Sequence, residues 1–459
     1  MRNVDEPKHS RQAVLHLLPT GTVLHRYVQW ASAIHGSPPV FHLACAVAFL
    51  LHELDRRGLR LPKVADVGEY PLTALFLFCC NSATGKTSAI NAIQDFSQAC
   101  WSEAGLDLDP WIKPDGSIQG ISHAVREHFD ESRNATSVIF YHQEASSLFA
   151  AREAVTELFC ELVDGRTIQS QFRYMQKAKK QDANANKIVN PRINGILATS
   201  EAQLAPHFRE SHRLGGIFTR LLWLRPEFNQ GDIWFSQDHE GADRGIAKMR
   251  TGLITHTVGW MALLEQMKAE TGPNFMFTAE AHAELGRRVF DPFKAAFQNA
   301  HADDNMHGVR MRLVEKARVF ATLSAALRCS AFVEVPDVVF ADALVKLFLG
   351  HAHSMYALGA GEIYRLALRA ESIIKASKDE GVLRRELYRV IRVDKKTMDQ
   401  ALETLMDQGV IYIDHQDRER NGRFVHVDST IGQMIVAKQE AETKAVLAVR
   451  EMGAQPWRA

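Results

Sequence analysis

The chain has no excess charge of either sign. Its 459 residues include 54 lysines and arginines and 54 aspartates and glutamates, so the formal net charge at neutral pH is zero. A protein without a global basic field does not attract polyanions over its whole surface. Any contact with nucleic acid must therefore come from local basic patches or from a channel.

The chain also lacks a disulfide framework, a zinc-binding cysteine cluster and a long apolar segment. Its six cysteines are scattered and no two have zinc-ligand spacing, which favours reduced, mostly buried thiols. The longest apolar run, residues 43–51, is too short to span a bilayer, and the polar start MRNVDEPKHSRQ has no signal-peptide core. We expect a soluble, cytoplasmic protein of about three domains.

A buried strand, a short loop and a helix follow one another within residues 72–96. Leu75–Cys79 is an apolar run of strand length, and apolar residues recur at helical spacing over residues 90–96. Between them lies the stretch Asn-Ser-Ala-Thr-Gly-Lys-Thr, residues 81–87. Such a loop can cradle phosphate, because backbone N–H groups at a helix N-terminus point at anionic oxygens.

This loop predicts a site for ATP and Mg²⁺. Lys86 would pair with the β- and γ-phosphates, and the Thr87 hydroxyl would ligate Mg²⁺. The expected nucleotide-binding residues of the loop are Asn81, Ser82, Ala83, Thr84, Gly85, Lys86, Thr87 and Ser88. The Walker pattern has glycine where Cys80 stands, so the loop enters without that conformational freedom. The alternative is a chance Gly-Lys-Thr at the start of a helix.

A second buried strand, residues 137–144, ends in a carboxylate. Glu144 occupies the place of the acid that polarises an attacking water, a role that contributes ~10²–10⁴-fold in rate. Gln143 stands where a magnesium-binding acid is usual, and we assign it to the metal site. The alternative is that Glu144 caps the helix expected over residues 145–158.

Two further strands carry polar residues at their ends. Residues 193–200 form a third apolar strand ending in Thr199 and Ser200, either of which would sense the γ-phosphate. Arg220 precedes the fourth strand, residues 221–224, and would reach a neighbouring subunit's nucleotide as an arginine finger. The alternative for Arg220 is an ion pair with a local carboxylate.

The segment between the second and third strands, residues 165–192, is locally basic and contains aromatic residues. Basic side chains beside aromatic ones can follow a phosphate backbone and stack bases. A solvated charged helix with a disordered tip is the alternative. The DNA-binding residues expected here are Arg173, Lys177, Lys179 and Lys180.

The remaining segments are mostly helical. Residues 12–58 predict helices packed on the core, and residues 241–355 predict a helical lid in which Arg318 would reach nucleotide. Three helices and a hairpin over residues 361–427 predict a winged helix-turn-helix. Its third helix offers Lys395 and Lys396 to DNA and its wing offers Arg420, although many winged helices bind proteins instead.

Taken in order, the Gly-Lys-Thr loop, the HQEA strand end, the basic insertion, the NPRINGILATSE strand and GGIFTR resemble a known family. The chain resembles uncharacterised P-loop ATPases of prophages, plasmids and genomic islands, which are similar to AAA+ replicative helicases of the minichromosome-maintenance type. The resemblance implies Lys86 and Thr87 as Walker A, Glu144 as the Walker B acid and Thr199 or Ser200 as the first sensor. It also implies Arg220 as the finger, Arg318 as a second sensor and the insertion as a pore hairpin.

We therefore expect an α/β P-loop core with added helical and winged-helix parts. The expected boundaries are 1–60 for N-terminal helices, 61–240 for the core, 241–355 for the lid, 356–428 for the winged helix and 429–459 for a helical tail. The leading functional hypothesis is a homo-oligomeric ring, a hexamer by resemblance, that moves on single-stranded DNA with ATP. The alternatives are an ATP-gated replication initiator and a regulatory or defence ATPase without unwinding activity.

Overall fold

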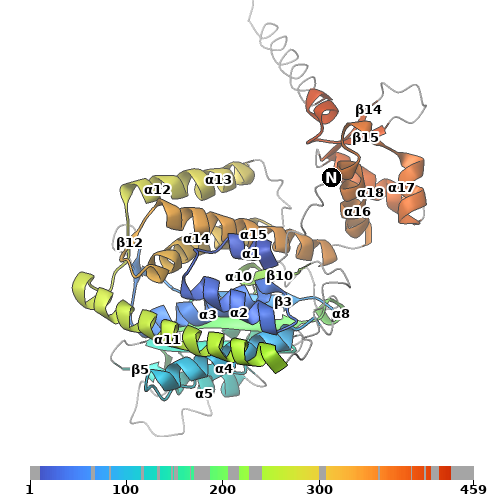
Figure 1. The fold of residues 1–459 in the computed structure, drawn as a ribbon. Helices are drawn as coiled ribbons and strands as arrows, with labels where there is room; N and C mark the ends of the chain where they lie inside the picture. Colours follow the sequence, from blue (N-terminus) through green and yellow to red (C-terminus); the bar gives the residue numbers. More distant parts are fainter. Residues whose placement is uncertain are drawn as a thin grey trace, which may run out of the picture. The chain divides into compact units, whose positions relative to one another are not determined.

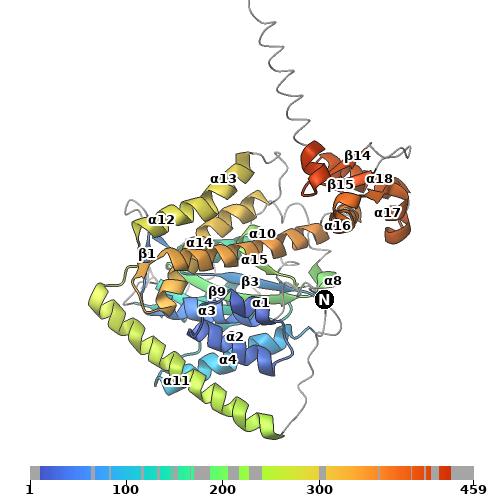
Figure 2. The ribbon, with the colours of Figure 1, turned by 45° about the horizontal axis from the view of Figure 1, so that its top comes forward.

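The fold consists of two compact units, Met1–Met355 and Tyr356–Ala459, which are described separately. The computed structural model describes residues 11–63, 68–81, 84–114, 118–131, 135–145, 148, 153–165, 167–169, 187–204, 217–226, 240–298, 306–359, 362–393, 395–407, 410–414 and 423–435. Figures 1 and 2 show these segments as coloured ribbons.

A mostly parallel sheet forms the centre of the first unit. Its strands are ordered β10-β3-β9-β6-β4, and β5 pairs with β6 in the antiparallel direction. The bounds of these strands are β3 (Leu75–Cys79), β4 (Trp111–Ile112), β5 (Phe129–Asp130), β6 (Ala135–His142), β9 (Pro191–Thr199) and β10 (Leu222–Leu224). The α/β class expected from the sequence is confirmed by this sheet, whose parallel centre is compatible with a P-loop-like core.

Asn194 and Gly195 fix the register of β9 against its neighbours. The buried Asn194 side chain accepts a hydrogen bond from the Ala74 N–H over 2.8 Å. A Cβ atom on Gly195 would lie 2.5 Å from Leu75 Cδ1 and 3.0 Å from the Phe140 carbonyl oxygen. Only glycine therefore allows β3 and β6 to approach β9 this closely on both sides.

The resulting register brings the carboxyl ends of three strands together. Cys79 of β3 lies opposite Thr199 of β9, and Leu197 of β9 lies opposite His142 of β6. Because all three strands run in the same direction, the residues that follow them emerge at one edge of the sheet, here called the carboxyl edge. The starts of the same strands define the amino edge.

Helices cover the sheet and pack on one another. α3 (Pro39–Arg56) lies directly on β9, β6 and β3, and α2 (Val23–Ile34), α4 (Lys86–Glu103) and α11 (Glu240–Thr271) form a connected layer with it. Nearly every residue of α3 is buried, and the Phe41 ring stacks on Phe78 of β3 with centroids 4.2 Å apart. The N-terminal helices are thus part of the same compact unit as the sheet.

A charged group is buried on α3 and satisfied there. Glu53 accepts hydrogen bonds from the Trp101 Nε1–H over 2.7 Å and from Arg56 over 3.2 Å, and it pairs with Arg57. Burial alone would raise the pKa of Glu53, but the two arginines lower it to about 2. This carboxylate therefore holds α3 to α4 in its charged form.

Shorter helices of the first unit include α1 (Arg11–His16) and α5 (Ile118–Arg126), and further helices follow α11 in the chain. They are α12 (Ala279–Leu285), the π-helical turn Gly286–Phe290, α13 (Asp291–Gln298), α14 (His307–Leu327) and α15 (Val335–Gly359), with strands β11 (Met276–Phe277) and β12 (Phe332–Val333) pairing between them. Phe348 of α15 contacts Phe320 of α14 and Phe76 of β3, each with ring centroids 5.6 Å apart. The helical structure expected of residues 241–355 is confirmed, and these contacts attach α14 and α15 to the sheet.

Residues 61–70 and 107–120, whose sequences predict a linker and a loop, contain three short strands. Residues 61–70 contain β1 (Leu61–Pro62) and β2 (Glu69–Tyr70), which pair antiparallel, and residues 107–120 contain the parallel strand β4. Each of the three strands has only two residues, which is too short to show a strand period in the sequence.

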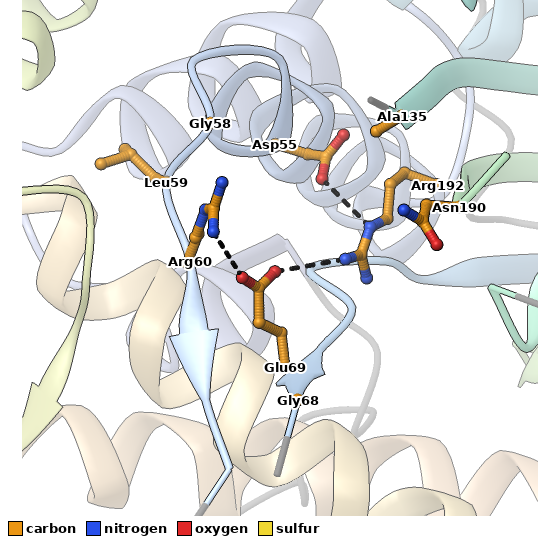
Figure 3. Close-up of a pocket in the computed structure, with 9 residues that line it drawn as sticks. All are labelled: Asp55, Gly58, Leu59, Arg60, Gly68, Glu69, Ala135, Asn190 and Arg192. Atoms are coloured by element: carbon orange, nitrogen blue, oxygen red, sulfur yellow. Dashed lines mark hydrogen bonds and ion pairs between the residues drawn. The ribbon is translucent and has the colours of Figure 1, made fainter. Parts of the chain in front are cut away.

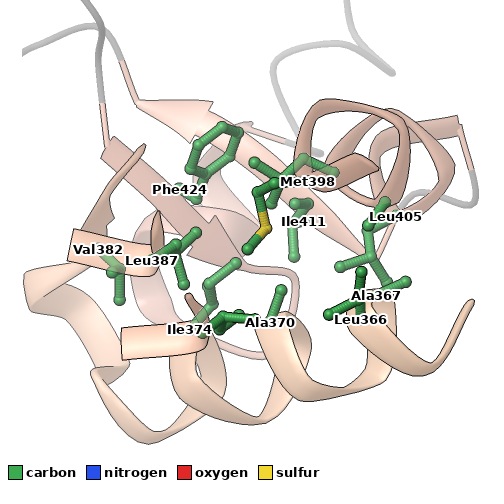
Figure 4. Close-up of a cluster of buried hydrophobic side chains, with 13 residues drawn as sticks. Leu366, Ala367, Ala370, Ile374, Val382, Leu387, Met398, Leu405, Ile411 and Phe424 are labelled. Carbon is green, nitrogen blue, oxygen red and sulfur yellow. The ribbon is translucent and has the colours of Figure 1, made fainter. Parts of the chain in front are cut away.

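The described part of the second unit contains three helices before a hairpin, a short helical segment at residues 430–435, and a three-stranded sheet ordered β13-β15-β14. The elements are α16 (Glu362–Ala376), a 3₁₀ turn (Lys378–Glu380), β13 (Val382–Leu383), α17 (Arg384–Ile391), α18 (Lys395–Asp407), β14 (Ile411–Asp414) and β15 (Arg423–His426). They share one apolar core, which includes Ile374, Leu387, Met398 and Phe424 (Figure 4). The expected order of three helices followed by a hairpin is confirmed, with β13 as an addition at the start of the second helix.

The six cysteines are free thiols, four of them buried. Among the residues that the structure describes, no helix is both long and apolar enough to cross a bilayer.

The buried His42 on α3 makes the stability of the first unit depend on pH. Its ring is fully buried among Tyr27 and His35, and neither ring nitrogen has a hydrogen-bond partner among the described residues. Burial, with a smaller effect of His35, lowers its pKa from 6.5 to about 3. Between these values the unfolded chain binds a proton that the folded chain does not. The free energy of unfolding should therefore fall by about 1.4 kcal/mol per pH unit for this group as the pH drops below about 6.5.

Urea denaturation at about pH 7.5 and about pH 5.5 measures this dependence. His42→Phe keeps an aromatic ring at the position. Between the two pH values, its free energy of unfolding should fall by about 1 kcal/mol less than that of wild type. The control His123→Phe changes a side chain that is 66% exposed and should follow wild type. Equal losses for wild type and His42→Phe would contradict the assignment.

Candidate functional site

The loop between β3 and α4, residues 80–87, begins at the carboxyl edge of the sheet. Gly85 is the N-cap of α4 and has φ 77°. The Ser37 hydroxyl donates a hydrogen bond to the Gly85 carbonyl over 2.8 Å, and a Cβ atom on Gly85 would lie 2.6 Å from Ser37 Oγ. Both the backbone angle and the close approach of Ser37 therefore require glycine at this position.

The Lys86 ammonium group lies against the loop. Its Nζ donates to the carbonyl oxygens of Cys80 and Asn81, each over 2.7 Å. Thr87 and Ser88 are exposed in the first turn of α4, so their hydroxyls face solvent beside the helix N-terminus. A cation, two hydroxyls and the backbone N–H groups of this turn are the groups that bind phosphate and its metal.

Cys80 does not distort the loop. It is buried, its backbone φ is not positive, and its Sγ lies 2.8 Å from Thr84 Oγ1. The Thr84 hydroxyl in turn donates to the Asn81 carbonyl over 2.9 Å. The position thus needs no glycine, and cysteine there adds a side-chain contact that closes the loop. Ser82 and Ala83 lie outside the described residues.

The end of β6 lies beside the helix that starts from this loop. Gln143 Nε2 donates to Asn91 Oδ1 over 3.1 Å, and Asn91 is one turn beyond Thr87 on α4. The Glu144 N–H donates to His142 Nδ1 over 3.1 Å, which orders the turn after the strand, and the Glu144 side chain is exposed. The structure thus places Lys86, Thr87, Gln143 and Glu144 at the same edge of the sheet.

Thr199 completes this edge. It is 1% exposed and pairs in register with Cys79, directly before the loop. Ser200 has a different local role, since its hydroxyl accepts the Gln203 N–H over 3.2 Å and so caps α8 (Glu201–Leu204). Of the two residues expected at the end of the third strand, Thr199 is therefore the one that faces the loop strand.

Arg220 lies at the amino edge, at the end of α10 (Ile217–Arg220) and before β10. Its guanidinium forms a two-pronged ion pair with Asp164, with distances of 2.8 and 2.6 Å, and Arg312 of α14 contacts the same carboxylate over 3.0 Å. The hydrogen bond to Asp164 raises the pKa of Arg220. Within the chain, Arg220 is thus paired with a local carboxylate and lies at the edge away from Lys86.

Arg318 does not reach the loop. Its guanidinium lies 4.4 Å from the Phe290 ring centroid and 5.1 Å from that of Tyr70, and burial lowers its pKa. The nearby Lys316 donates a hydrogen bond to the Thr73 carbonyl. Thr73 lies seven residues before Cys80, so about 20 Å of extended strand separates this contact from the start of the loop. Cation–π contacts thus hold Arg318 at the amino edge, away from the loop of its own chain, and its contact with nucleotide stays a prediction.

The sequence interpretation missed an ion pair beside the loop. Arg225 follows β10 and binds Glu201 over 2.7 and 3.3 Å, and both charges affect the pKa of Cys79, which burial raises. The Arg225 N–H and carbonyl also contact Nδ1 of the buried His351 from α15. The available signal was that each charged residue directly follows a buried strand of the parallel sheet.

A cavity of about 270 Å³ lies at the amino edge, between α3, β2 and the starts of β6 and β9 (Figure 3). Glu69 accepts from Arg60 over 3.0 Å and from Arg192 over 3.3 Å, and Arg192 lies 3.8 Å from Asp55. The two arginines and two carboxylates that line the cavity therefore neutralise one another. The cavity is therefore separate from the loop site and carries no excess charge.

The residues expected to contact DNA are only partly described. Arg173, Lys177, Lys179, Lys180 and Arg420 lie outside the described residues. Two short strands, β7 (Ile168–Gln169) and β8 (Lys187–Ile188), pair antiparallel on either side of the basic insertion. Lys395 and Lys396 are exposed in the first turn of α18.

Comparison with known proteins does not identify a family. No protein-family model matches the chain, and no curated protein has a significant match to it. Among the described residues, no group of three or more histidine, cysteine or acidic side chains is arranged to hold a metal ion. A magnesium ion brought by a nucleotide needs no such group, since phosphates, water and one or two protein oxygens suffice.

Replacement of Gly85 should test how tightly the loop is constrained. Gly85→Ala should lower the free energy of unfolding by roughly 2 kcal/mol, because the left-handed backbone and the contact with Ser37 both oppose a Cβ atom. Gly252→Ala is the matched control: this exposed position of α11 has no atom within 4 Å of the added carbon, so alanine should stabilise by roughly 0.5–1 kcal/mol. Urea denaturation measures both, and a neutral effect of Gly85→Ala would refute the constraint.

Proposed function

We propose that the protein is a P-loop ATPase that acts on DNA as a ring-forming motor. The observation that carries the proposal is the position of four polar residues at the carboxyl edge. Lys86 and Thr87 start α4. Gln143 contacts that helix over 3.1 Å, and Glu144 is the next residue after Gln143. In open α/β sheets, ligands bind outside the carboxyl ends of the strands.

The strand order supports the finer assignment to the AAA+ type. β9 lies between the loop strand β3 and the acid strand β6, and β10 flanks β3 on the other side. This is the arrangement expected of the AAA+ cores that the motifs resemble, with Thr199 on the inserted strand. The helices after α11 would correspond to the lid and those before β3 to a collar.

The residues fit ATP and magnesium. The Lys86 ammonium, now on two loop carbonyls, would exchange them for phosphate oxygens, a charge-assisted contact. The exposed Thr87 hydroxyl and the amide oxygen of Gln143 are oxygen ligands of the kind that magnesium takes. Magnesium, when bound, neutralises charge on the β- and γ-phosphates. Glu144 would orient and deprotonate the attacking water, and Thr199 would bond the terminal phosphate.

Arg220 fits a role between subunits. It lies at the opposite edge from the loop of its own chain, so it can serve only a neighbour's nucleotide. To do so it must leave Asp164, and Arg312 remains to pair with that carboxylate. The exchange of a carboxylate for a phosphate costs little electrostatically, because the arginine keeps an anionic partner throughout.

DNA would be held at two places. The base of the insertion is a short antiparallel ladder, β7–β8, which suits a hairpin that carries its basic residues into a ring channel. The second unit has the helix and hairpin order of a winged helix-turn-helix.

A second candidate is an ATP-gated initiator that assembles on DNA without unwinding it. Gln143 favours this candidate, because it is a neutral side chain at the metal position and is already hydrogen-bonded to Asn91. Weak metal binding would slow hydrolysis but leave nucleotide-dependent assembly intact.

The site assignment predicts which variants lose ATPase activity. Lys86→Ala should abolish DNA-stimulated hydrolysis, and Glu144→Gln should lower turnover by ~10²–10⁴-fold while ATP still binds. Lys248→Ala and Glu157→Gln change exposed side chains of α11 and α7 (Glu153–Val163) and serve as controls. Phosphate release, calorimetry with Mg·ATP and strand separation on forked DNA are the measurements.

The outcomes separate the candidates. Hydrolysis with strand separation supports the motor, whereas ATP-dependent assembly on DNA without strand separation supports the initiator. Wild type that binds no Mg·ATP, or Lys86→Ala that hydrolyses normally, removes both.

The subunit-interface role of Arg220 predicts complementation. Lys86→Ala and Arg220→Ala proteins should each be inactive, but their equal mixture should regain activity at about one quarter of interfaces, those that combine an intact Lys86 with a neighbour's intact Arg220. Arg220→Ala should still fold, since Asp164 keeps Arg312 at 3.0 Å. A mixture no more active than its separate components would exclude the role.

A further inference from the structure

A row of cations runs along α17 and continues past it. Arg385, Arg389 and Arg392 occupy positions i, i+4 and i+7 and are exposed, so they share one helix face over about 10 Å. Lys395 and Lys396, also exposed, follow in the first turn of α18. We call these five residues the α17 row.

The row has an excess of positive charge, and four of its five side chains have no partner among the described residues. Residues 384–396 contain six basic residues against two acidic ones, Glu386 and Asp394, although the whole chain has no net charge. Within the described part of the chain, the side chains of Arg389, Arg392 and both lysines have no hydrogen-bond or ion-pair partner, whereas Arg385 makes an interaction within the fold.

The neighbouring Arg384 shows the contrast. It lies 3.6 Å from Asp399 and over the Phe424 ring at 5.7 Å, so it packs α17 against α18 and the sheet. Arg384 therefore has a structural role. The cations of the row are exposed instead, and the core of the unit, to which Leu387 and Ile391 contribute from the opposite face of α17, does not include them.

Basic residues are locally unfavourable at several positions of the row. Lys395 and Lys396 stand in the first turn of α18, where the helix dipole disfavours cations. Arg392 has φ 57°, a left-handed conformation that glycine or asparagine adopts at lower cost. Departures of this kind from local rules are expected at functional surfaces.

We propose that the α17 row binds the phosphate backbone of duplex DNA without reading its sequence. The proposal rests on the proposed function in taking DNA as the polyanion on which the protein acts. This contact with the DNA backbone is different from sequence recognition, in which the third helix, α18, would contact base edges. On α18 beyond the first turn, Asp399 is held by the Tyr388 hydroxyl and Glu403 is exposed, so the exposed charge at Glu403 opposes a polyanion there.

The chemistry of the row favours phosphate over an acidic protein. Arginine forks match phosphate oxygens in two-pronged contacts. Among the described residues of α17, Val390 is the one large apolar side chain that is exposed, at 52%. Protein partners generally require an apolar centre in the interface, whereas backbone binding to DNA requires only distributed cations.

The test is the salt dependence of duplex binding by the full-length chain. R385Q/R389Q/R392Q should weaken binding to two unrelated duplexes equally and reduce the slope of log K against log salt by about 2 to 3, since each lost phosphate contact removes about 0.9. R369Q/K375Q/K378Q is the matched control: it removes three exposed cations from α16 and the adjoining turn of the same unit and should leave the slope unchanged. Thermal melting confirms that both variants fold.

Three results would overturn the proposal: an unchanged slope for the row variant, more than about tenfold discrimination between the two duplexes, or displacement of duplex by polyglutamate at equal charge. The last would assign the row to an acidic protein. ATP hydrolysis is measured in parallel and should be unaffected by the row variant in the absence of DNA. If the wild type has no ATPase activity but binds duplex through the α17 row, the proposed function is refuted and the DNA-binding role of the row stands. If the wild type hydrolyses ATP but does not bind duplex, the role of the row is refuted and the proposed function stands.

Discussion

The close approach of β9 to both of its neighbours is the constraint on which the candidate site depends. Asn194 bonds the chain that enters β3, and Gly195 leaves no room for a side chain between Leu75 and the Phe140 carbonyl. Together they set a register in which Thr199 ends beside Cys79 and β6 ends beside α4. The chemistry proposed at the carboxyl edge is therefore positioned by two residues near the middle of the sheet, which take no part in it themselves.

Cationic side chains are paired differently at the two edges of the sheet. At the carboxyl edge, Arg225 is paired with Glu201, but Lys86 contacts only neutral groups among the described residues, the carbonyl oxygens of Cys80 and Asn81 and the Cys80 sulfur, which leaves its charge suited to an anion. At the amino edge, cations are matched within the chain: Arg220 with Asp164, Arg192 with Glu69, and Arg318 with two aromatic rings. Cations at the amino edge can therefore act on a partner only by exchanging one contact for another.

The sequence predicted those features whose signals are local. The loop before α4, the strand ends at Glu144 and Thr199, and the helices and hairpin of the second unit each lie in one short stretch with its own pattern. The Arg225–Glu201 pair was missed because its members are 24 positions apart and meet only when β9 and β10 flank β3. The position of Arg318 was missed because Phe290 and Tyr70 come from distant segments. Nucleotide, DNA and ring assembly remain predictions.

The bond from Ser37 to Gly85, together with the stacking of Phe41 on Phe78, has a practical consequence for dividing the chain. A fragment cut to begin at β1 would strip α3 from the sheet, exposing the faces of β3, β6 and β9 that it covers. It would also leave the loop without the hydroxyl that secures its glycine. A fragment that keeps these contacts must therefore start before Ser37, even though every recognisable motif lies beyond residue 74.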